Sequence, residues 1–337
     1  MIWNDIELFN VAEIEQREDG AWRLYRFPRK VREVFATPCF EGDPSDRIGQ
    51  MTTGCELRFV CDAVDIELSA STDGIVDIFR GDYSYRIVPM KAGERTIISL
   101  RKNTEIEKND ISGVPNARFS PDVWRVTLGN DNYIVLHEIK AHAPIRPPRS
   151  DELPQKTILA YGSSITHGLN ADLHSTSYVM TMGRVLGTDV LCKGMGGSCF
   201  CQREVADYIA NEHWDVALLE LGINMVSRFE VEEFAQRATA LVKSVLACGK
   251  PVVLVSNYTC LFDLPTHTLN DKNEQYVKAS ERIYEMLKCD DLYYVRGRDI
   301  LDTISLLATD LIHPSTYGHG EMGRRLAHKL REQFHIL

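Results

Sequence analysis

Apolar and polar residues alternate through much of the segment from residue 21 to residue 142. Residues 55–61 (CELRFVC) carry an apolar side chain at every second position, and residues 64–70 (VDIELSA) repeat the pattern. A period of two is typical of a β-strand that has one buried face and one face in water. Further strands are predicted, between turn signals such as DG and GND, at residues 74–81, 83–90, 95–102, 124–129 and 133–142. Many short strands at this spacing predict an all-β sandwich of the jelly-roll kind, without a helix of useful length.

Residues 143–150 (APIRPPRS) interrupt this pattern with three prolines and two arginines. This composition favours an extended polyproline conformation over either a helix or a paired strand. The sequence therefore predicts a domain boundary here, with a β-sandwich domain over residues 1–148 and a second domain over residues 149–337.

Beyond the boundary, short apolar runs alternate with helical patterns. The predicted strands are residues 157–161, 188–193, 215–221, 251–257 and 292–295, and they are mostly apolar, as strands buried on both faces are. Helical spacing of three and four residues is clearest at residues 231–250, and a last helix is predicted at residues 317–334. This alternation predicts a parallel sheet with helices on both faces, a three-layer α/β/α domain.

Composition excludes several classes of protein. The 337 residues are 44% hydrophobic and 26% charged, which is ordinary for a soluble globular protein of two domains. The net charge of −10 disfavours binding to nucleic acid or to an anionic membrane. No apolar run approaches the roughly 20 residues of a membrane span. The N-terminus MIWNDIELFN lacks the basic start and apolar core of a signal peptide, so we expect a cytoplasmic protein.

Nine cysteines are present, and several lie within apolar runs, which is typical of small buried side chains in a reducing compartment. Cys199 and Cys201 are the closest pair. Because no second pair or histidine set accompanies them, they are weak evidence for a metal site, and no metal is predicted.

Ligands of an open α/β sheet bind beyond the carboxyl ends of the strands, so the loops after the predicted strands are the first candidates for function. The first loop, GSSITHG at residues 162–168, can raise Ser164 at the start of a helix. The second, KGMGGS at residues 193–198, can offer the N–H of Gly197 to a developing negative charge. The third, LGINM at residues 221–225, can offer the amide of Asn224 to the same charge. Each loop in isolation is also a common turn or helix cap.

A fourth segment, TDLIHP at residues 309–314, carries Asp310 and His313 three positions apart. At this spacing the carboxylate can fix the tautomer of the imidazole while the other ring nitrogen accepts a serine proton. A surface turn is the alternative if the segment is taken alone. Together the four segments supply a nucleophile, a base, an orienting acid and oxyanion donors, and this combination predicts nucleophilic catalysis.

These four segments resemble, in order and spacing, the sequence blocks of the SGNH hydrolases, also called GDSL-type esterases and lipases, over about residues 155–335. The resemblance implies a flavodoxin-like α/β/α fold and hydrolysis through an acyl-serine intermediate. It implies Ser164 as nucleophile, His313 as base and Asp310 as its orienting acid. It also implies an oxyanion hole formed by the backbone N–H groups of Ser164 and Gly197 and by the amide of Asn224. No metal or organic cofactor is implied.

Two positions depart from the family pattern. Ser163 stands where the first block often has aspartate, and Met225 stands where the third block often has aspartate. Neither position belongs to the triad, so the departures bear on the subfamily and the substrate.

A β-sandwich that precedes such a domain resembles the arrangement of two-domain SGNH carbohydrate esterases, which remove acetyl groups from polysaccharides or oligosaccharides. The expected function is therefore hydrolysis of small acyl esters, O-acetyl above all, on a small molecule or oligosaccharide. One alternative is a lysophospholipase or thioesterase, whose acyl groove would be lined by apolar residues of these loops, namely Met195, Phe200, Met225, Val226 and Phe262. Another alternative is a glycan-binding protein without catalysis, against which the complete set of triad residues argues.

Overall fold

The computed structural model describes residues 1–109, 111 and 117–337. By its internal contacts the chain divides into two compact units. Unit 1 comprises Met1–Arg29, Gly49–Gln155 and Leu173–Ser175, and unit 2 comprises Lys30–Ile48, Lys156–Asp172 and Thr176–Leu337.

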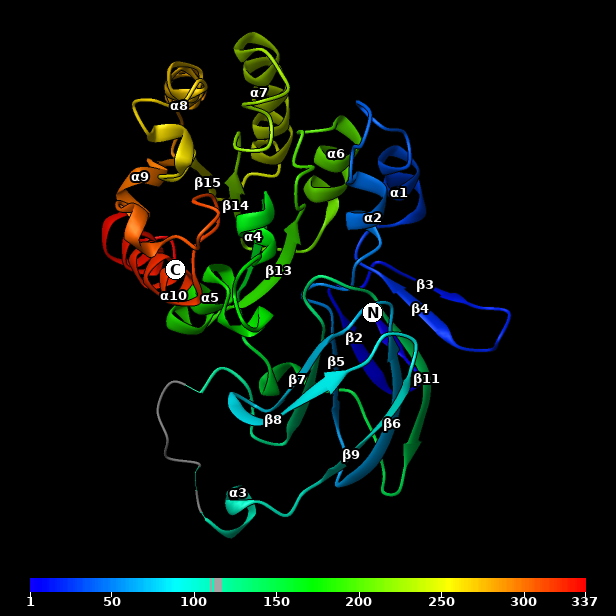
Figure 1. Cartoon of the computed structure of the whole chain (residues 1–337). Coiled ribbons are helices and arrows are strands. Elements are labelled where there is room, and N and C mark those ends of the chain that lie inside the picture. Colours follow the sequence, from blue (N-terminus) through cyan, green and yellow to red (C-terminus); the bar gives the residue numbers. More distant parts are fainter. Residues whose placement is uncertain (110, 112–116) are drawn as a thin grey trace. The chain divides into compact units, whose positions relative to one another are not determined.

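Unit 1 is a β-sandwich of two antiparallel sheets, which confirms the predicted all-β fold (Figure 1). One sheet has the strand order β1 (Ile2–Trp3), β2 (Ile6–Phe9), β5 (Glu56–Val60), β10 (Val123–Leu128), β7 (Gly74–Arg80) and β8 (Tyr83–Met90). The other has the order β3 (Glu13–Gln16), β4 (Trp22–Tyr25), β11 (Ile134–Ala141), β6 (Ala63–Ala70) and β9 (Arg95–Arg101). The predicted strands from residue 55 to residue 142 lie within two residues of the observed ones at each end.

The core of the sandwich is built from the inward positions of both sheets. Leu57, Val126 and Ile78 of one sheet share a buried cluster with Ile66 and Leu68 of the other. In β6 every second residue is buried, as the period-two pattern predicts.

The outward face of β5 is not in water, contrary to the prediction from alternation. Glu56 and Arg58 are each 1% exposed. Glu56 accepts hydrogen bonds from Arg58 at 2.7 Å and from Arg125 of β10 at 2.5 Å. The guanidinium of Arg58 lies 3.5 Å from the ring centroid of Phe9. Paired charges covered by an aromatic ring can be buried at an acceptable cost, and a polar position in the sequence does not distinguish this from solvent exposure.

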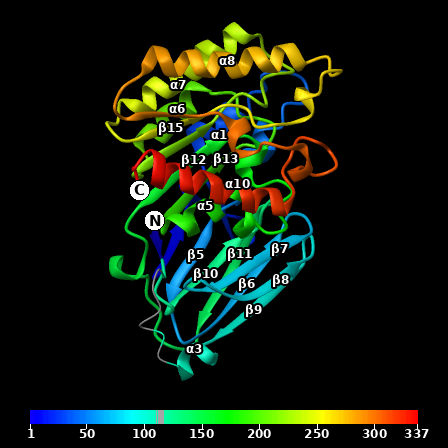
Figure 2. The same cartoon turned by 90° about the vertical axis from the view of Figure 1, so that its left-hand side faces the viewer.

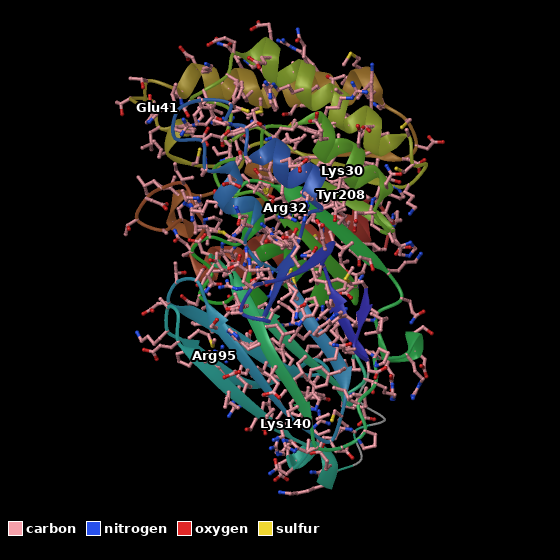
Figure 3. All side chains as sticks on the ribbon, turned by 90° about the vertical axis from the view of Figure 1, so that its right-hand side faces the viewer. Lys30, Arg32, Glu41, Arg95, Lys140 and Tyr208 are labelled. Atoms are coloured by element: carbon pink, nitrogen blue, oxygen red, sulfur yellow. The ribbon has the colours of Figure 1, made fainter. Side chains whose placement is uncertain are left out.

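Short helices occur where the pattern predicted none. They are α1 (Arg29–Phe35), α2 (Ser45–Gly49) and α3 (Glu105–Lys108). Residues Lys30–Ile48, which include most of α1 and α2, belong to unit 2 by their contacts. In the sequence, however, they lie between strands of unit 1. Figure 3 marks Lys30 and Arg32 on α1, and it marks Arg95 and Lys140 on strands β9 and β11.

The division by contacts thus differs from the predicted domains at residues 1–148 and 149–337. The main boundary falls between Gln155 and Lys156, just before the first strand of unit 2. In addition, Lys30–Ile48 belongs to unit 2 and Leu173–Ser175 belongs to unit 1. Proline content marks where a chain becomes extended, but it does not report which unit an inserted segment packs on.

Unit 2 contains a five-stranded parallel sheet with the order β13 (Asp189–Gly194), β12 (Thr157–Gly162), β14 (Val216–Glu220), β15 (Val252–Val255) and β16 (Leu292–Val295). All four strand pairings are parallel. In chain order this is 2-1-3-4-5, the flavodoxin-like arrangement that the family resemblance implies. The direction of winding reverses between β12 and β14, and in open α/β sheets ligands bind beyond the carboxyl ends of the strands at such a reversal.

Helices cover both faces of this sheet (Figure 2). Helices α5 (Tyr178–Leu186) and α10 (Thr316–His328) lie on one side and share a buried cluster with Ile158, Val190 and Val253 of the strands. Helices α6 (Arg203–Asn211), α7 (Val231–Leu246) and α8 (Asn270–Leu287) lie on the other side. The three-layer prediction is confirmed, and α7 begins at the predicted residue, although the sequence pattern did not predict α8. Unit 2 also contains the short helices α4 (Ser164–His167) and α9 (Gly297–Ile300).

Candidate active site

The turn after β12 places Ser164 at the first position of α4. Ser163 precedes this helix as its N-cap, and its Oγ accepts a hydrogen bond from the N–H of Ile165 at 3.1 Å. The turn is too tight for a side chain at Gly162, because a Cβ there would lie 2.3 Å from Thr166 Oγ1 and 2.6 Å from Glu220 Oε2. The glycine is therefore required for the close approach that sets the start of α4.

Ser164, His313 and Asp310 form a continuous chain of hydrogen bonds. Ser164 Oγ lies 2.7 Å from His313 Nε2, and His313 Nδ1 lies 2.7 Å from Asp310 Oδ2. The serine is only 6% exposed, whereas the Asp310 side chain is 44% exposed. The two ends of this chain are 146 residues apart in sequence, and the fold brings them together at the carboxyl edge of the parallel sheet.

The loop around Asp310 orients the carboxylate. Its Oδ1 accepts hydrogen bonds from the N–H groups of Ile312 at 2.9 Å and His313 at 3.0 Å, and its Oδ2 also accepts one from Asn170 Nδ2 at 3.2 Å. Burial acts to raise the pKa of Asp310, but the hydrogen bonds from His313 and Ile312 outweigh it and lower the pKa to about 2. Asp310 is therefore ionised throughout the neutral range, where it can fix the tautomer of the imidazole and stabilise its charged form.

Gly197 and Asn224 lie on the loops after β13 and β14. Gly197 has φ +71°, a conformation that favours glycine. The side-chain oxygen of Asn224 accepts a hydrogen bond from the N–H of Cys199 at 3.1 Å, which leaves its NH₂ group as the donor of the amide. Among the described residues, neither the N–H of Ser164 nor that of Gly197 donates a hydrogen bond to another protein group. These donors are available to a ligand.

A segment from the N-terminal part of the sequence packs on the glycine loop, which sequence reasoning missed. A Cβ built on Gly197 would lie 3.2 Å from Pro44 Cγ, and one built on Gly196 would lie 3.6 Å from Ile48 Cδ1 and 3.8 Å from Ser164 Cβ. Farther along, Phe40 packs edge-on against Phe200 at 5.5 Å between ring centroids. No pattern at residues 30–48 indicated this role, because the contact is purely tertiary.

Glu220, the last residue of β14, lies beneath the serine turn and was also missed. Its Oε2 accepts hydrogen bonds from the N–H and the Oγ of Ser163, each at 2.7 Å, and from Thr166 Oγ1 at 3.1 Å. A signal was present in the sequence, since Glu220 is the only charged residue inside the apolar strand segment VALLEL at residues 216–221.

The cysteines are free thiols in the structure. Within the described residues, no group of three or more histidine, cysteine, aspartate or glutamate side chains could hold a metal ion. In the same part of the chain, no helix is both long enough and apolar enough to cross a membrane.

Comparison with solved structures shows the same two-part fold in other proteins. The salicylyl-acyltransferase SsfX3 from a tetracycline biosynthetic pathway is 17% identical, with a TM-score of 0.77 over 95% of this chain and 92% of that one. A family two carbohydrate esterase from Cellvibrio japonicus is 15% identical, with a TM-score of 0.62 over 98% of this chain and 96% of that one. An acetyl xylan esterase (Est2A) from the rumen bacterium Butyrivibrio proteoclasticus is 12% identical, with a TM-score of 0.57 over 100% of this chain and 98% of that one.

At these identities the likeness establishes the fold and leaves the substrate open. No curated protein matches the chain in sequence. The sequence model of the GDSL-like lipase/acylhydrolase family matches residues 155–331, which span the parallel sheet and all four loops described above. Because this match covers more than half of the chain, the protein belongs to the GDSL-like lipase/acylhydrolase family.

Proposed function

We propose that this protein is a serine esterase that hydrolyses small acyl esters, most of all O-acetyl groups on carbohydrate, through an acyl-serine intermediate. The observation that carries the proposal is the chain of two 2.7 Å hydrogen bonds from Ser164 through His313 to Asp310. A serine hydroxyl is a weak nucleophile unless a base receives its proton, and this geometry supplies the base and holds it.

The mechanism follows from these positions. Ser164 Oγ attacks the ester carbonyl carbon while its proton passes to His313 Nε2. The tetrahedral intermediate then collapses, the bond to the alcohol oxygen breaks, and His313 returns the proton to the leaving alcohol. Water, deprotonated by His313, attacks the acyl-serine in the same way, which releases the carboxylic acid and restores the serine. The ionised Asp310 stabilises the imidazolium that forms in each half of the cycle.

The negative charge on the tetrahedral oxygen is stabilised by the N–H groups of Ser164 and Gly197 and by the amide of Asn224. Replacement of Asn224 by alanine removes one of these donors, and we expect kcat to fall by about 10²–10³ while KM changes little, because the charge exists only in the transition state. Steady-state kinetics on p-nitrophenyl acetate measures both constants. A rise in KM at unchanged kcat would instead make Asn224 a ground-state contact.

Burial of the neighbouring apolar residues supports a short acyl group. Met195, Phe200, Met225 and Val226 are fully buried and pack within unit 2, so they do not line an open groove for a long chain, whereas Phe262 is half-buried. Ile48, on the segment that packs against Gly196, is 3% exposed. Four of the five apolar residues near the candidate site thus belong to the packed interior of unit 2. This arrangement favours acetyl over the long acyl chain of a lysophospholipid or thioester.

The β-sandwich and the comparisons support a carbohydrate substrate. Proteins with the same two-part fold include a carbohydrate esterase and an acetyl xylan esterase. A panel of acetylated oligosaccharides and of p-nitrophenyl esters from acetate to octanoate tests the proposal. We expect kcat/KM to be at least about tenfold higher for acetate than for octanoate, since a pocket fitted to the smaller group excludes the larger. A preference for octanoate would favour the lysophospholipase or thioesterase alternative, and no turnover of any ester would favour the glycan-binding alternative.

A further inference from the structure

Glu220 is a buried carboxylate that the mechanism above does not use. Its side chain is 0% exposed, and it forms no ion pair with any lysine, arginine or histidine in the described part of the chain. A carboxylate in this position is costly to bury unless hydrogen bonds compensate for its lost hydration. A neutral residue of similar size would avoid that cost, so the presence of the acid calls for a role beyond packing.

Three hydrogen bonds converge on one oxygen of this side chain. Glu220 Oε2 accepts from the N–H and the hydroxyl of Ser163, and from the hydroxyl of Thr166. These two residues lie one position before and two positions after the proposed nucleophile. Ser163 Oγ in turn accepts from the N–H of Ile165, so the carboxylate is linked to the cap of α4 and to its interior.

Helix α4 needs such support because it has only four residues, Ser164–His167. An isolated helix of this length is unstable in water, since the first turn fixes several backbone dihedrals for a single hydrogen bond. The absence of a side chain at Gly162 leaves room for the carboxylate, because a Cβ there would lie 2.6 Å from Glu220 Oε2. The turn and the Glu220 carboxylate are therefore in direct contact.

We propose that Glu220 is a positioning residue, whose ionised carboxylate holds the backbone turn that presents Ser164 to His313. This inference rests on the proposed function, because it takes Ser164 as the nucleophile. It adds a requirement that the triad alone does not contain, namely a hydrogen-bond acceptor beneath the turn, which holds the turn best when it is ionised.

The protonation state of Glu220 determines how strongly it can hold the turn that carries Ser164. The groups that face it are neutral hydroxyls and thiols: Tyr178, which hydrogen-bonds Thr166 Oγ1 at 2.7 Å, Tyr258, which packs on Tyr178, and Cys199, whose Sγ lies 3.8 Å from the Glu220 carbonyl oxygen. Burial raises the pKa of Glu220 to about 7, although the hydrogen bonds from Ser163 and Thr166 oppose the rise.

A proton on Glu220 Oε2 would displace one of the three donors. A proton on Oε1 would find no acceptor, since this atom has no hydrogen-bond partner among the described residues. The protonated acid therefore holds the turn less well than the carboxylate. Protonation of Glu220 should thus lower kcat/KM as the pH falls below about 7, in addition to any effect of pH on the triad.

The experiment compares Glu220→Leu and Glu220→Gln with the wild-type protein. The rate of phosphonylation of Ser164 by a fluorophosphonate is followed by mass spectrometry, together with kcat/KM on p-nitrophenyl acetate and the thermal unfolding midpoint. We expect Glu220→Leu to slow phosphonylation by about 10²-fold, because it removes the acceptor of three hydrogen bonds. A matched control is Val253→Ala, a buried core substitution on β15 that should lower the unfolding midpoint without slowing phosphonylation.

Glu220→Gln keeps an acceptor oxygen but cannot ionise. We expect this variant to stay within about tenfold of the wild-type rate at pH 8 and to show a shallower acid limb in log(kcat/KM), since residue 220 no longer titrates. Phosphonylation of Glu220→Leu at the wild-type rate, or an acid limb in Glu220→Gln identical to that of the wild type, would overturn the inference. If Glu220→Leu does not fold, the acid limb of Glu220→Gln decides. The proposed function fails separately, if the wild-type protein neither reacts with the fluorophosphonate nor hydrolyses the ester.

Discussion

Replacement of Ser164 by alanine is expected to lower kcat on p-nitrophenyl acetate by at least about 10⁴-fold. The reason is that the hydroxyl that lies 2.7 Å from His313 Nε2 is the atom that forms the covalent intermediate in the proposed mechanism. Donors of the oxyanion hole remain in the variant and leave a residual rate above that of the reaction in water. Substrate binding should change little, since Oγ is a small part of the contact surface. Steady-state kinetics with a purified, folded variant measures the loss.

Ser163→Ala is the matched control, because it removes the adjacent hydroxyl. Ser163 Oγ caps α4 and bonds to Glu220, but its backbone N–H keeps its own bond to the same carboxylate. Loss of a helix cap costs about 1 kcal/mol, which corresponds to less than tenfold in rate. Ser163→Ala should therefore lose less than about tenfold in kcat, against at least about 10⁴-fold for Ser164→Ala. If Ser163→Ala abolished turnover while Ser164→Ala did not, the assignment of the nucleophile would be wrong.

Replacement of His313 by alanine should be nearly as damaging, with a loss of about 10⁴-fold in kcat, because no other base lies within hydrogen-bond distance of Ser164 Oγ among the described residues. In the wild-type protein, kcat/KM should rise with pH, because the mechanism needs an unprotonated imidazole at residue 313 to accept the proton of Ser164. Asp310 does not contribute to this limb, because its pKa of about 2 keeps it ionised well below neutrality.

The pH dependence of kcat/KM measures this acid limb directly. In His313→Ala, the part of the limb that depends on the imidazole should be absent from the residual activity. The contribution expected from Glu220 remains in that variant, whereas it is absent from Glu220→Gln, so the two variants separate the two groups. A flat wild-type profile between about pH 5 and pH 8 would argue against a histidine base in the mechanism.

The elements whose side chains follow a simple period could be predicted from the sequence. Strand β6 alternates, as a strand with one buried face does, and β14 is almost wholly apolar, as a strand buried on both faces is. Helix α7 carries an apolar stripe, as a helix that packs on one side does. The loops of the candidate site could be predicted for a related reason, because the carboxyl edge of a parallel sheet is where strand-following loops converge. Residues that lie more than 140 positions apart could thus be assigned to one place.

Contacts that depend on tertiary packing could not be predicted. Residues 30–48 carry no pattern that reports which unit they pack on, although Pro44 and Ile48 lie against the glycine loop. Glu56 occupies a polar position of an alternating strand and is buried all the same, since Arg58 and Arg125 supply the partners that water would otherwise provide. Glu220 illustrates the same limit at the site, because its effect comes from donors on a different loop.

The central claim is that Ser164 becomes covalently acylated during turnover. The most direct measurement is rapid acid quenching of the protein with p-nitrophenyl acetate, followed by peptide mass spectrometry. The account predicts an acetyl group on Ser164 that accumulates within the first turnover, disappears on further incubation, and is absent from Ser164→Ala. Acetylation that turns over at another residue, or hydrolysis at full rate with no acetylated serine at any quench time, would contradict it.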